Sequence, residues 1–157
     1  MLRYRLDDLG WFQFEWLVQS LLKAKFGVGI ESWGGRGDHG RDAFHKGSLE
    51  FPRDGKLFEG PFVFQVKFVE EANAAGAKPR PRIISAVNFE IKRMTERRDL
   101  PEKSVYVLIS NVALSPKLRT EIASLFQSTF PELEPFTIGG QDLCDLLDSV
   151  HPQMVTN

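Results

Sequence analysis

Three polar residues have the side-chain types needed for phosphate chemistry. Asp42 follows a glycine-rich segment, and Gln65 and Lys67 stand further along in the apolar run Phe62–Phe68. A carboxylate and an amide carbonyl supply the hard oxygen ligands that divalent cations such as Mg²⁺ prefer. An ammonium beside them can act on a water polarised by the cation. If the fold gathers these residues, they form a site for a divalent cation and a polarised water.

The run Phe62–Phe68 is typical of a β-strand, and residues 42–45 form a second extended run. Because side chains alternate between the two faces of a strand, Gln65 and Lys67 point one way, and Phe64, Val66 and Phe68 point the other way. Two such runs can pair as a hairpin. Asp42 would then face Gln65 and Lys67 across the sheet.

The glycine-rich segment Gly35–Asp42 would shape the approach to this site. Gly37 and Gly40 permit a tight turn, because glycine enters positive φ freely. Asp38 either supports the site or bonds to backbone amides of its own loop. Taken alone, the segment is a polar turn, and Gln65 and Lys67 alone are the wet face of an edge strand.

The combined pattern is more specific than either half. Gly-x-Gly-Asp-x-Gly-x-Asp, then Gln-x-Lys on an apolar strand, after a helix containing Phe14-Glu15, resembles the Mrr-type branch of the PD-(D/E)xK nucleases. That superfamily includes many restriction endonucleases. The resemblance implies a restriction-endonuclease-like three-layer α/β/α fold with a central mixed sheet, spanning residues 1–157 as one nuclease domain. It also implies a Mg²⁺- or Mn²⁺-dependent DNA endonuclease of restriction or antiphage defence.

The resemblance assigns a role to each site residue. Asp42 would bind the metal together with Gln65, which takes the position usually held by Asp or Glu, and with the Val66 backbone carbonyl. Lys67 would orient or deprotonate the attacking water. Glu15 lies at the margin of the apolar face of its helix, so it is either a solvated carboxylate or one aimed at the metal or its waters. Because an amide carries no charge, this site should hold a metal more weakly than a site with two carboxylates, unless Glu15 or Asp38 compensates.

Charge is segregated along the chain, although the formal net charge is only −1. Residues 78–98 contain seven basic and two acidic side chains, a local net charge of +5. Such a patch suits contacts with nucleic-acid phosphates, while a solvated charged helix face is the alternative. The predicted DNA-binding residues are Lys78, Arg80, Arg82, Lys92, Arg93 and Arg97.

Two other functions fit the same residues. One is a catalytically inactive DNA-binding or protein-interaction module on the same fold, and the other is a domain that regulates an attached ATPase. As partners we expect DNA, and a second copy of the chain if both strands are cut. A sensor or ATPase domain, linked or separate, would fit if the chain is the N-terminal module of a longer protein.

The glycine pattern also matches the dinucleotide-binding fingerprint, but residues 41–47 are too short and too charged for the helix which that fingerprint requires. His39, His45 and His151 lack a second ligand at a zinc-binding spacing, and only His39 in the glycine loop remains a candidate. The single cysteine, Cys144, excludes an intrachain disulfide.

At 157 residues, with 42% apolar and 26% charged residues, the chain has the composition of one globular domain. No apolar run approaches the roughly 20 residues of a membrane helix, and residues 1–8 lack a signal-peptide core. We therefore expect a cytoplasmic protein.

Hydrophobic periodicity and end signals predict the remaining elements. Asp7 or Asp8 would cap a helix over 9–26 that ends at Gly27. Trp11 would be among the residues of this helix that face the sheet. Ser115 would cap another helix over 115–128. Further helices are expected over 83–98 and 141–150, with strands over 28–33, 42–45, 62–68, 104–110 and 136–138. The helix over 83–98 would pack through Ile84, Val87, Ile91 and Met94. We expect a turn-rich link over 46–60 and a mobile loop over 70–81.

Overall fold

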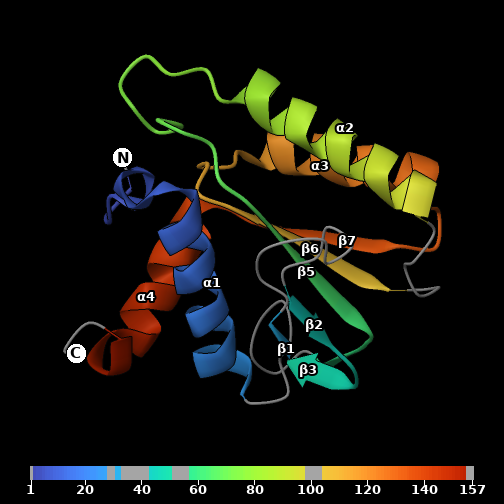
Figure 1. Cartoon of the computed structure of the whole chain (residues 1–157), viewed down its shortest axis with the longest axis horizontal. Helices are drawn as coiled ribbons and strands as arrows, with labels where there is room; N and C mark the ends of the chain where they lie inside the picture. Colours follow the sequence, from blue (N-terminus) through green and yellow to red (C-terminus); the bar gives the residue numbers. More distant parts are fainter. Residues whose placement is uncertain (1, 28–30, 33–42, 51–56, 98–103, 155–157) are drawn as a thin grey trace.

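A mixed five-stranded sheet lies at the centre of the molecule (Figure 1). The computed structural model describes residues 2–27, 31–32, 43–50, 57–97 and 104–154. In the order β1-β2-β5-β6-β7, the sheet contains β1 (Glu31–Ser32), β2 (Ala43–His45), β5 (Phe62–Lys67), β6 (Val105–Ser110) and β7 (Glu134–Ile138). The first three strands pair antiparallel, and the last three pair parallel. The predicted central mixed sheet is confirmed.

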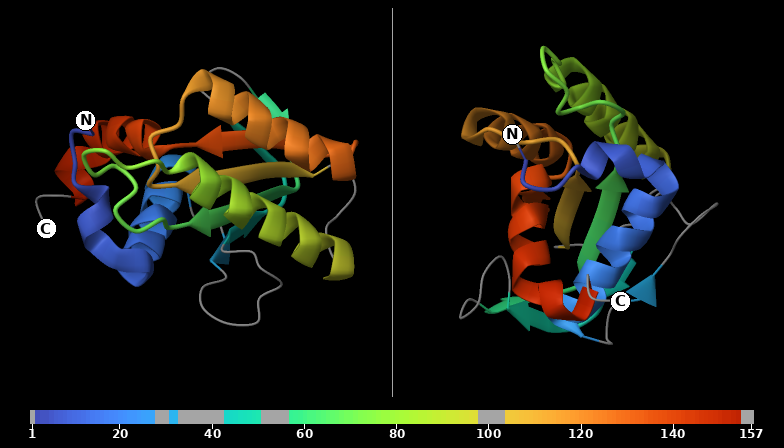
Figure 2. Two further views of the ribbon diagram at one scale, coloured as in Figure 1. Left: turned by 90° about the horizontal axis from the view of Figure 1, so that it is seen from above. Right: turned by 90° about the vertical axis from the view of Figure 1, so that its left-hand side faces the viewer.

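Helices cover both faces of this sheet (Figures 1 and 2). They are the 3₁₀ helix η1 (Leu6–Leu9), α1 (Gly10–Phe26), α2 (Arg80–Arg97), α3 (Pro116–Thr129) and α4 (Gly140–Met154). The first core cluster contains apolar residues of α1 and α4 with Phe62, Phe64 and Val66 of β5. The second contains residues of α2 and α3 with Val63 of β5 and Tyr106 and Leu108 of β6.

The strand β5 is central, between β2 and β6. Its alternation follows the sequence prediction, since Phe64 and Val66 pack in the first cluster and Val63 packs in the second. The interpretation of Gln65 and Lys67 as the wet face of an edge strand is therefore wrong. All six residues of β6 are buried, as expected for a strand covered on both faces.

Helix ends follow local signals in two cases and not in a third. Gly27, at φ 94°, ends α1, and the Ser115 hydroxyl accepts a hydrogen bond from the Leu118 N–H at the start of α3. No side chain caps the start of α1, where a capping Asp7 or Asp8 was expected. Trp11 was expected to face the sheet but is exposed.

The link before β5 contains a hairpin that the sequence did not predict. Strands β3 (Ser48–Glu50) and β4 (Leu57–Glu59) pair antiparallel. Leu49 is buried in the first core cluster. Phe58 meets Phe136 of β7 edge-on, with ring centroids 5.4 Å apart. The hairpin thus adds apolar cover to the sheet face shared by α1 and α4.

The connection between β5 and α2 is fixed by hydrogen bonds, although the sequence predicted a mobile loop over 70–81. Asn73 donates through its backbone N–H and its side chain to the carboxylate of Asp7, both at 2.8 Å. Its side-chain oxygen accepts from the Ala113 N–H at 3.0 Å. Ala72 is buried, and α2 already begins at Arg80. Asp7 therefore joins distant segments instead of capping α1.

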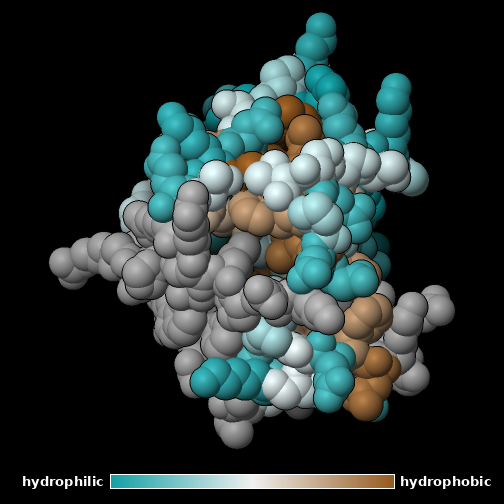
Figure 3. Space-filling view, turned by 90° about the vertical axis from the view of Figure 1, so that its right-hand side faces the viewer, coloured by the Kyte–Doolittle hydropathy of each residue, from teal (hydrophilic) through white to brown (hydrophobic). Residues whose placement is uncertain are grey.

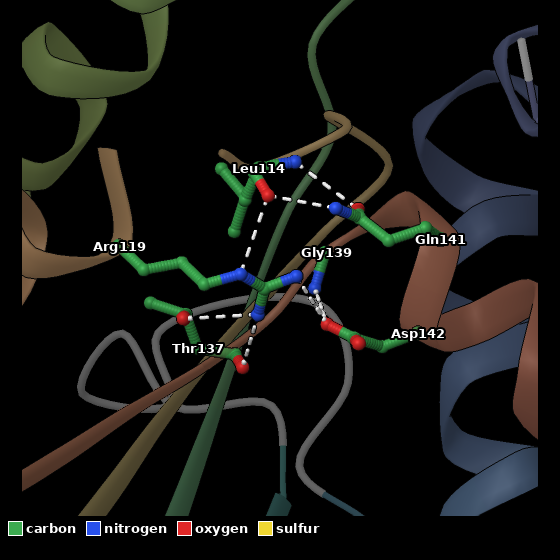
Figure 4. A network of polar contacts seen from close by, with 6 residues as sticks. All are labelled: Leu114, Arg119, Thr137, Gly139, Gln141 and Asp142. Carbon is green, nitrogen blue, oxygen red and sulfur yellow. Dashed lines mark hydrogen bonds and ion pairs between the residues drawn. The ribbon is translucent and has the colours of Figure 1, made fainter. Parts of the chain in front are cut away.

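Arg119 of α3 holds the corner between β7 and α4 (Figure 4). Its guanidinium donates to the backbone oxygens of Leu114 and Thr137 and forms an ion pair with Asp142 at 2.7 Å. Asp142 also accepts from the Gly139 N–H at 2.8 Å. One side chain thus binds three elements together.

None of the helices in the described ranges has the length and apolar character needed to cross a membrane.

Candidate active site around Lys67

Gln65 and Lys67 lie at the carboxyl end of the central strand β5. The alternation of the strand directs both toward the face that α2 covers, because Val63 on that face packs with α2. The Gln65 residue is only 5% exposed, and the Lys67 side chain is 21% exposed. An amide and an ammonium are thus held at the inner end of a buried strand, where low dielectric strengthens charge interactions.

The predicted pairing of β2 with β5 is confirmed for the described residues. Ala43 lies opposite Phe64, Phe44 opposite Val63, and His45 opposite Phe62, in antiparallel register. The His45 ring lies 6.1 Å from the Phe62 ring. Asp42, Asp38, Gly37 and Gly40 lie outside the described residues, so their roles in the site stay predictions.

Lys67 forms an ion pair with Glu90 of α2. Glu90 is only 1% exposed, and its Oε1 atom also accepts from Nη1 of Arg93 at 3.0 Å. The Phe89 ring lies beside both cations, with its centroid 5.9 Å from Lys67 Nζ and 5.7 Å from Arg93 Cζ. One buried carboxylate is therefore shared by two basic side chains, under an aromatic ring that is 58% exposed.

Glu90 was not identified as a site residue from the sequence, although a signal was present. The buried apolar residues of α2 are Ile83, Val87 and Met94, which recur at helical spacing. Glu90 occupies the position of that buried stripe between Val87 and Met94. A carboxylate inside an apolar stripe needs a partner. The predicted packing of α2 is confirmed, since Val87 and Met94 are buried in the second core cluster and the partly buried Ile84 and Ile91 pack against it.

Glu15 lies on the opposite side of the sheet from this cluster. It is half-buried on α1, and α1 packs with Phe62, Phe64 and Val66. Gln65 and Lys67 face α2 instead. The structure therefore does not bring Glu15 to their face, and its role stays a prediction.

Several basic residues of the predicted DNA-binding patch have partners within the chain. Arg80 pairs with Glu121 of α3, and Arg82 donates to the Glu70 carbonyl oxygen. Lys78 and Lys92 are exposed. Figure 3 views the end of the molecule where α2 finishes, and hydrophilic side chains lie there beside residues of intermediate and apolar character. The side chain of Arg97 lies outside the described residues.

Within the described part of the chain, no group of three or more His, Cys, Asp or Glu side chains is arranged to hold a metal. Besides the Glu90 carboxylate, which Lys67 and Arg93 share, the described oxygen donors at this end of β5 are the Gln65 amide and the Val66 backbone carbonyl. Because Glu90 already pairs with two cations, a metal site at this strand would take its carboxylate from outside the described residues, such as Asp42.

The chain is similar in structure to a known protein, although its sequence gives no match. No protein-family model matches the chain. No curated protein matches it either. Among solved structures the chain is similar to one described as the DNA modification-dependent restriction endonuclease AspBHI, at 18% identity and a TM-score of 0.49. The match covers 93% of this chain and 35% of that one.

Proposed function

We propose that the chain is a metal-dependent DNA endonuclease of the PD-(D/E)xK type, with the restriction-endonuclease-like three-layer fold of the Mrr branch. The observation that carries this proposal is the position of Lys67. Its ammonium is held at the end of the central strand, on the same face as the buried Gln65. The antiparallel register of β2 brings the chain that follows Asp42 beside this strand.

The proposed position of Asp42 follows if the pairing of β2 with β5 continues for one more residue. Since Ala43 lies opposite Phe64, Asp42 would lie opposite Gln65, and opposite residues of an antiparallel pair point to the same face. The Asp42 carboxylate, the Gln65 amide oxygen and the Val66 carbonyl would hold Mg²⁺ or Mn²⁺. These are hard oxygen donors, which suits either ion. The bound ion supplies Lewis acidity and a water of lowered pKa.

Lys67 would act on the phosphate side of this site. An ammonium has three donors and no acceptor, so it can orient the attacking water and neutralise charge that develops on the phosphate. The low exposure of Lys67 and Gln65 limits the water that competes for these interactions. The exposed Lys78 and Lys92 would contact the DNA backbone further from the scissile bond.

Cleavage of supercoiled plasmid by the purified chain tests this function. We expect nicking or linearisation with Mg²⁺ or Mn²⁺, none with EDTA, and none in Asp42→Ala or Lys67→Ala. Lys117→Ala, which removes an exposed lysine of α3, is the matched control and should cleave normally. Unchanged cleavage by a pure, folded Asp42→Ala or Lys67→Ala variant would remove the proposed site.

A catalytically inactive binding module is the second candidate, and one observation favours it. Lys67 forms an ion pair with a buried carboxylate, and a lysine with a purely structural role would form the same pair. This candidate predicts DNA binding that does not depend on metal, with no cleavage under any divalent ion.

The proposed nuclease would act in restriction or antiphage defence. It would act as a dimer if both strands are cut, and with a sensor or ATPase domain if a partner activates it.

A further inference from the structure

We infer that Glu90 and Arg93 are positioning residues for Lys67. This inference rests on the proposed nuclease function and names the residues that prepare its lysine. Glu90 would fix the Lys67 ammonium at the end of β5, and Arg93 would keep the cluster cationic. In that case Arg93 acts through Glu90 and not by contacting DNA.

The burial of Glu90 is the first observation. A carboxylate that is 1% exposed must be compensated, and Glu90 lies between the apolar residues Val87 and Met94. Well-packed apolar residues often replace a buried ion pair without loss of stability. Packing of the apolar stripe therefore does not by itself explain a carboxylate at this position, and its two cationic partners have to be considered. A requirement for a fixed ammonium at position 67 explains it.

The charge of the cluster is the second observation. A lone Lys–Glu pair is neutral and offers little to a phosphate whose negative charge grows in the transition state. Here two cations, Lys67 and Arg93, share the single carboxylate of Glu90, so the cluster has a formal charge of +1. The ammonium is thus held by an anion without its charge being cancelled.

The geometry is the third observation. Glu90 and Arg93 lie three residues apart on one helix, so that α2 fixes both. Lys67 comes from the sheet and meets the same Oε1 atom of Glu90 that Arg93 meets. Phe89 lies beside both cations and gives the ammonium a second contact. The long lysine side chain is thereby restricted to one position.

Steady-state cleavage of Glu90→Gln gives the first test. A misplaced catalytic group costs about 100-fold in rate for a shift of about 1 Å, so we expect kcat to fall about 10- to 100-fold. KM should stay within about two-fold, because a residue this buried cannot contact DNA. Glu90→Asp should recover part of the rate. Glu96→Gln removes the same charge from an exposed position of α2 and should leave kcat unchanged.

Amine labelling gives a readout that needs no cleavage. Trace acetic anhydride acylates free amines, and mass spectrometry reports the rate at each lysine. We expect Lys67 to label several-fold faster in Glu90→Gln than in the wild type, with no change in Glu96→Gln. Arg93→Gln should lower kcat without raising the labelling rate, because Lys67 keeps its partner while the cluster becomes neutral.

These outcomes separate the inference from the proposed function. Unchanged Lys67 labelling in Glu90→Gln, or a loss in Arg93→Gln that falls on KM alone, overturns the inference. If the wild type does not cleave DNA and Lys67 labelling still rises in Glu90→Gln, the proposed nuclease function fails, whereas the fixing of Lys67 by Glu90 stands.

Discussion

Asn111, at the end of β6, should be among the residues most sensitive to substitution. It is 0% exposed, and its side chain takes part in four hydrogen bonds, three of which reach residues outside its own segment. Its amide oxygen accepts from the Val69 N–H at 2.8 Å, and its amide nitrogen donates to the Val69 carbonyl at 2.8 Å and to Asp7 at 2.9 Å. The residue thus satisfies both backbone groups of the buried Val69.

Asn111→Ala would leave the N–H and the carbonyl of Val69 without their partners. Each buried group left unsatisfied costs about 1–3 kcal/mol. Asp7 loses one donor but keeps the two from Asn73. We therefore expect the free energy of unfolding to fall by about 3 kcal/mol. That loss corresponds to a melting temperature lower by about 6–12 °C for a chain of this size.

Urea unfolding followed by tryptophan fluorescence measures this effect. The midpoint should fall while the slope m stays constant, because the surface exposed on unfolding is unchanged. Asn88→Ala removes the same side chain from an exposed position of α2 and should change stability by less than about 0.5 kcal/mol. A loss below about 1 kcal/mol in Asn111→Ala would refute the reasoning that these bonds are the partners of Val69.

Further predictions concern single contacts. The hydrogen bond that Tyr4 donates to Asp148 at 2.7 Å, followed by loss of hydration, raises the pKa of Tyr4. A raised folded-state pKa stabilises the protonated form, so the advantage of the wild type over Tyr4→Phe should be full below about pH 10. It should disappear as the pH rises through the folded pKa, which chemical unfolding across that range would reveal. Ser115→Ala removes the cap of α3 and should cost about 1 kcal/mol by the same measurement. Gly140→Ala would put a Cβ atom 2.4 Å from the backbone oxygen of Asn111, so we expect a loss of about 1–3 kcal/mol in thermal unfolding.

Features that depend on short-range order were predictable from the sequence. The alternation of β5, the burial of β6 and the serine cap of α3 each follow from a few neighbouring residues. The β3–β4 hairpin was not predictable, because its strands are three residues long and only Leu49 among its six residues is buried. Its pairing depends on packing against residues far along the chain.

The residues of the candidate site also fall into those that the sequence identified and those that it did not. Gln65 and Lys67 were identified because strand periodicity alone puts them on one face. Asp7 looked like a helix cap, since its partners Asn73 and Asn111 are remote in sequence. Glu90 was counted only as a charge in a basic segment, because its partner Lys67 belongs to another element. Polar contacts between elements are what the sequence does not reveal.

The two faces of the sheet are completed at different times during synthesis. The second core cluster ends with Leu133, whereas the first needs Leu143, Leu147 and Val150 of α4 as well as α1. A ribosome makes the chain from its amino end, so α1 can pack against its partner helix only after residues 140–154 have been made. The apolar side of β5 is the last surface to be covered, after the side that carries Lys67 and Glu90.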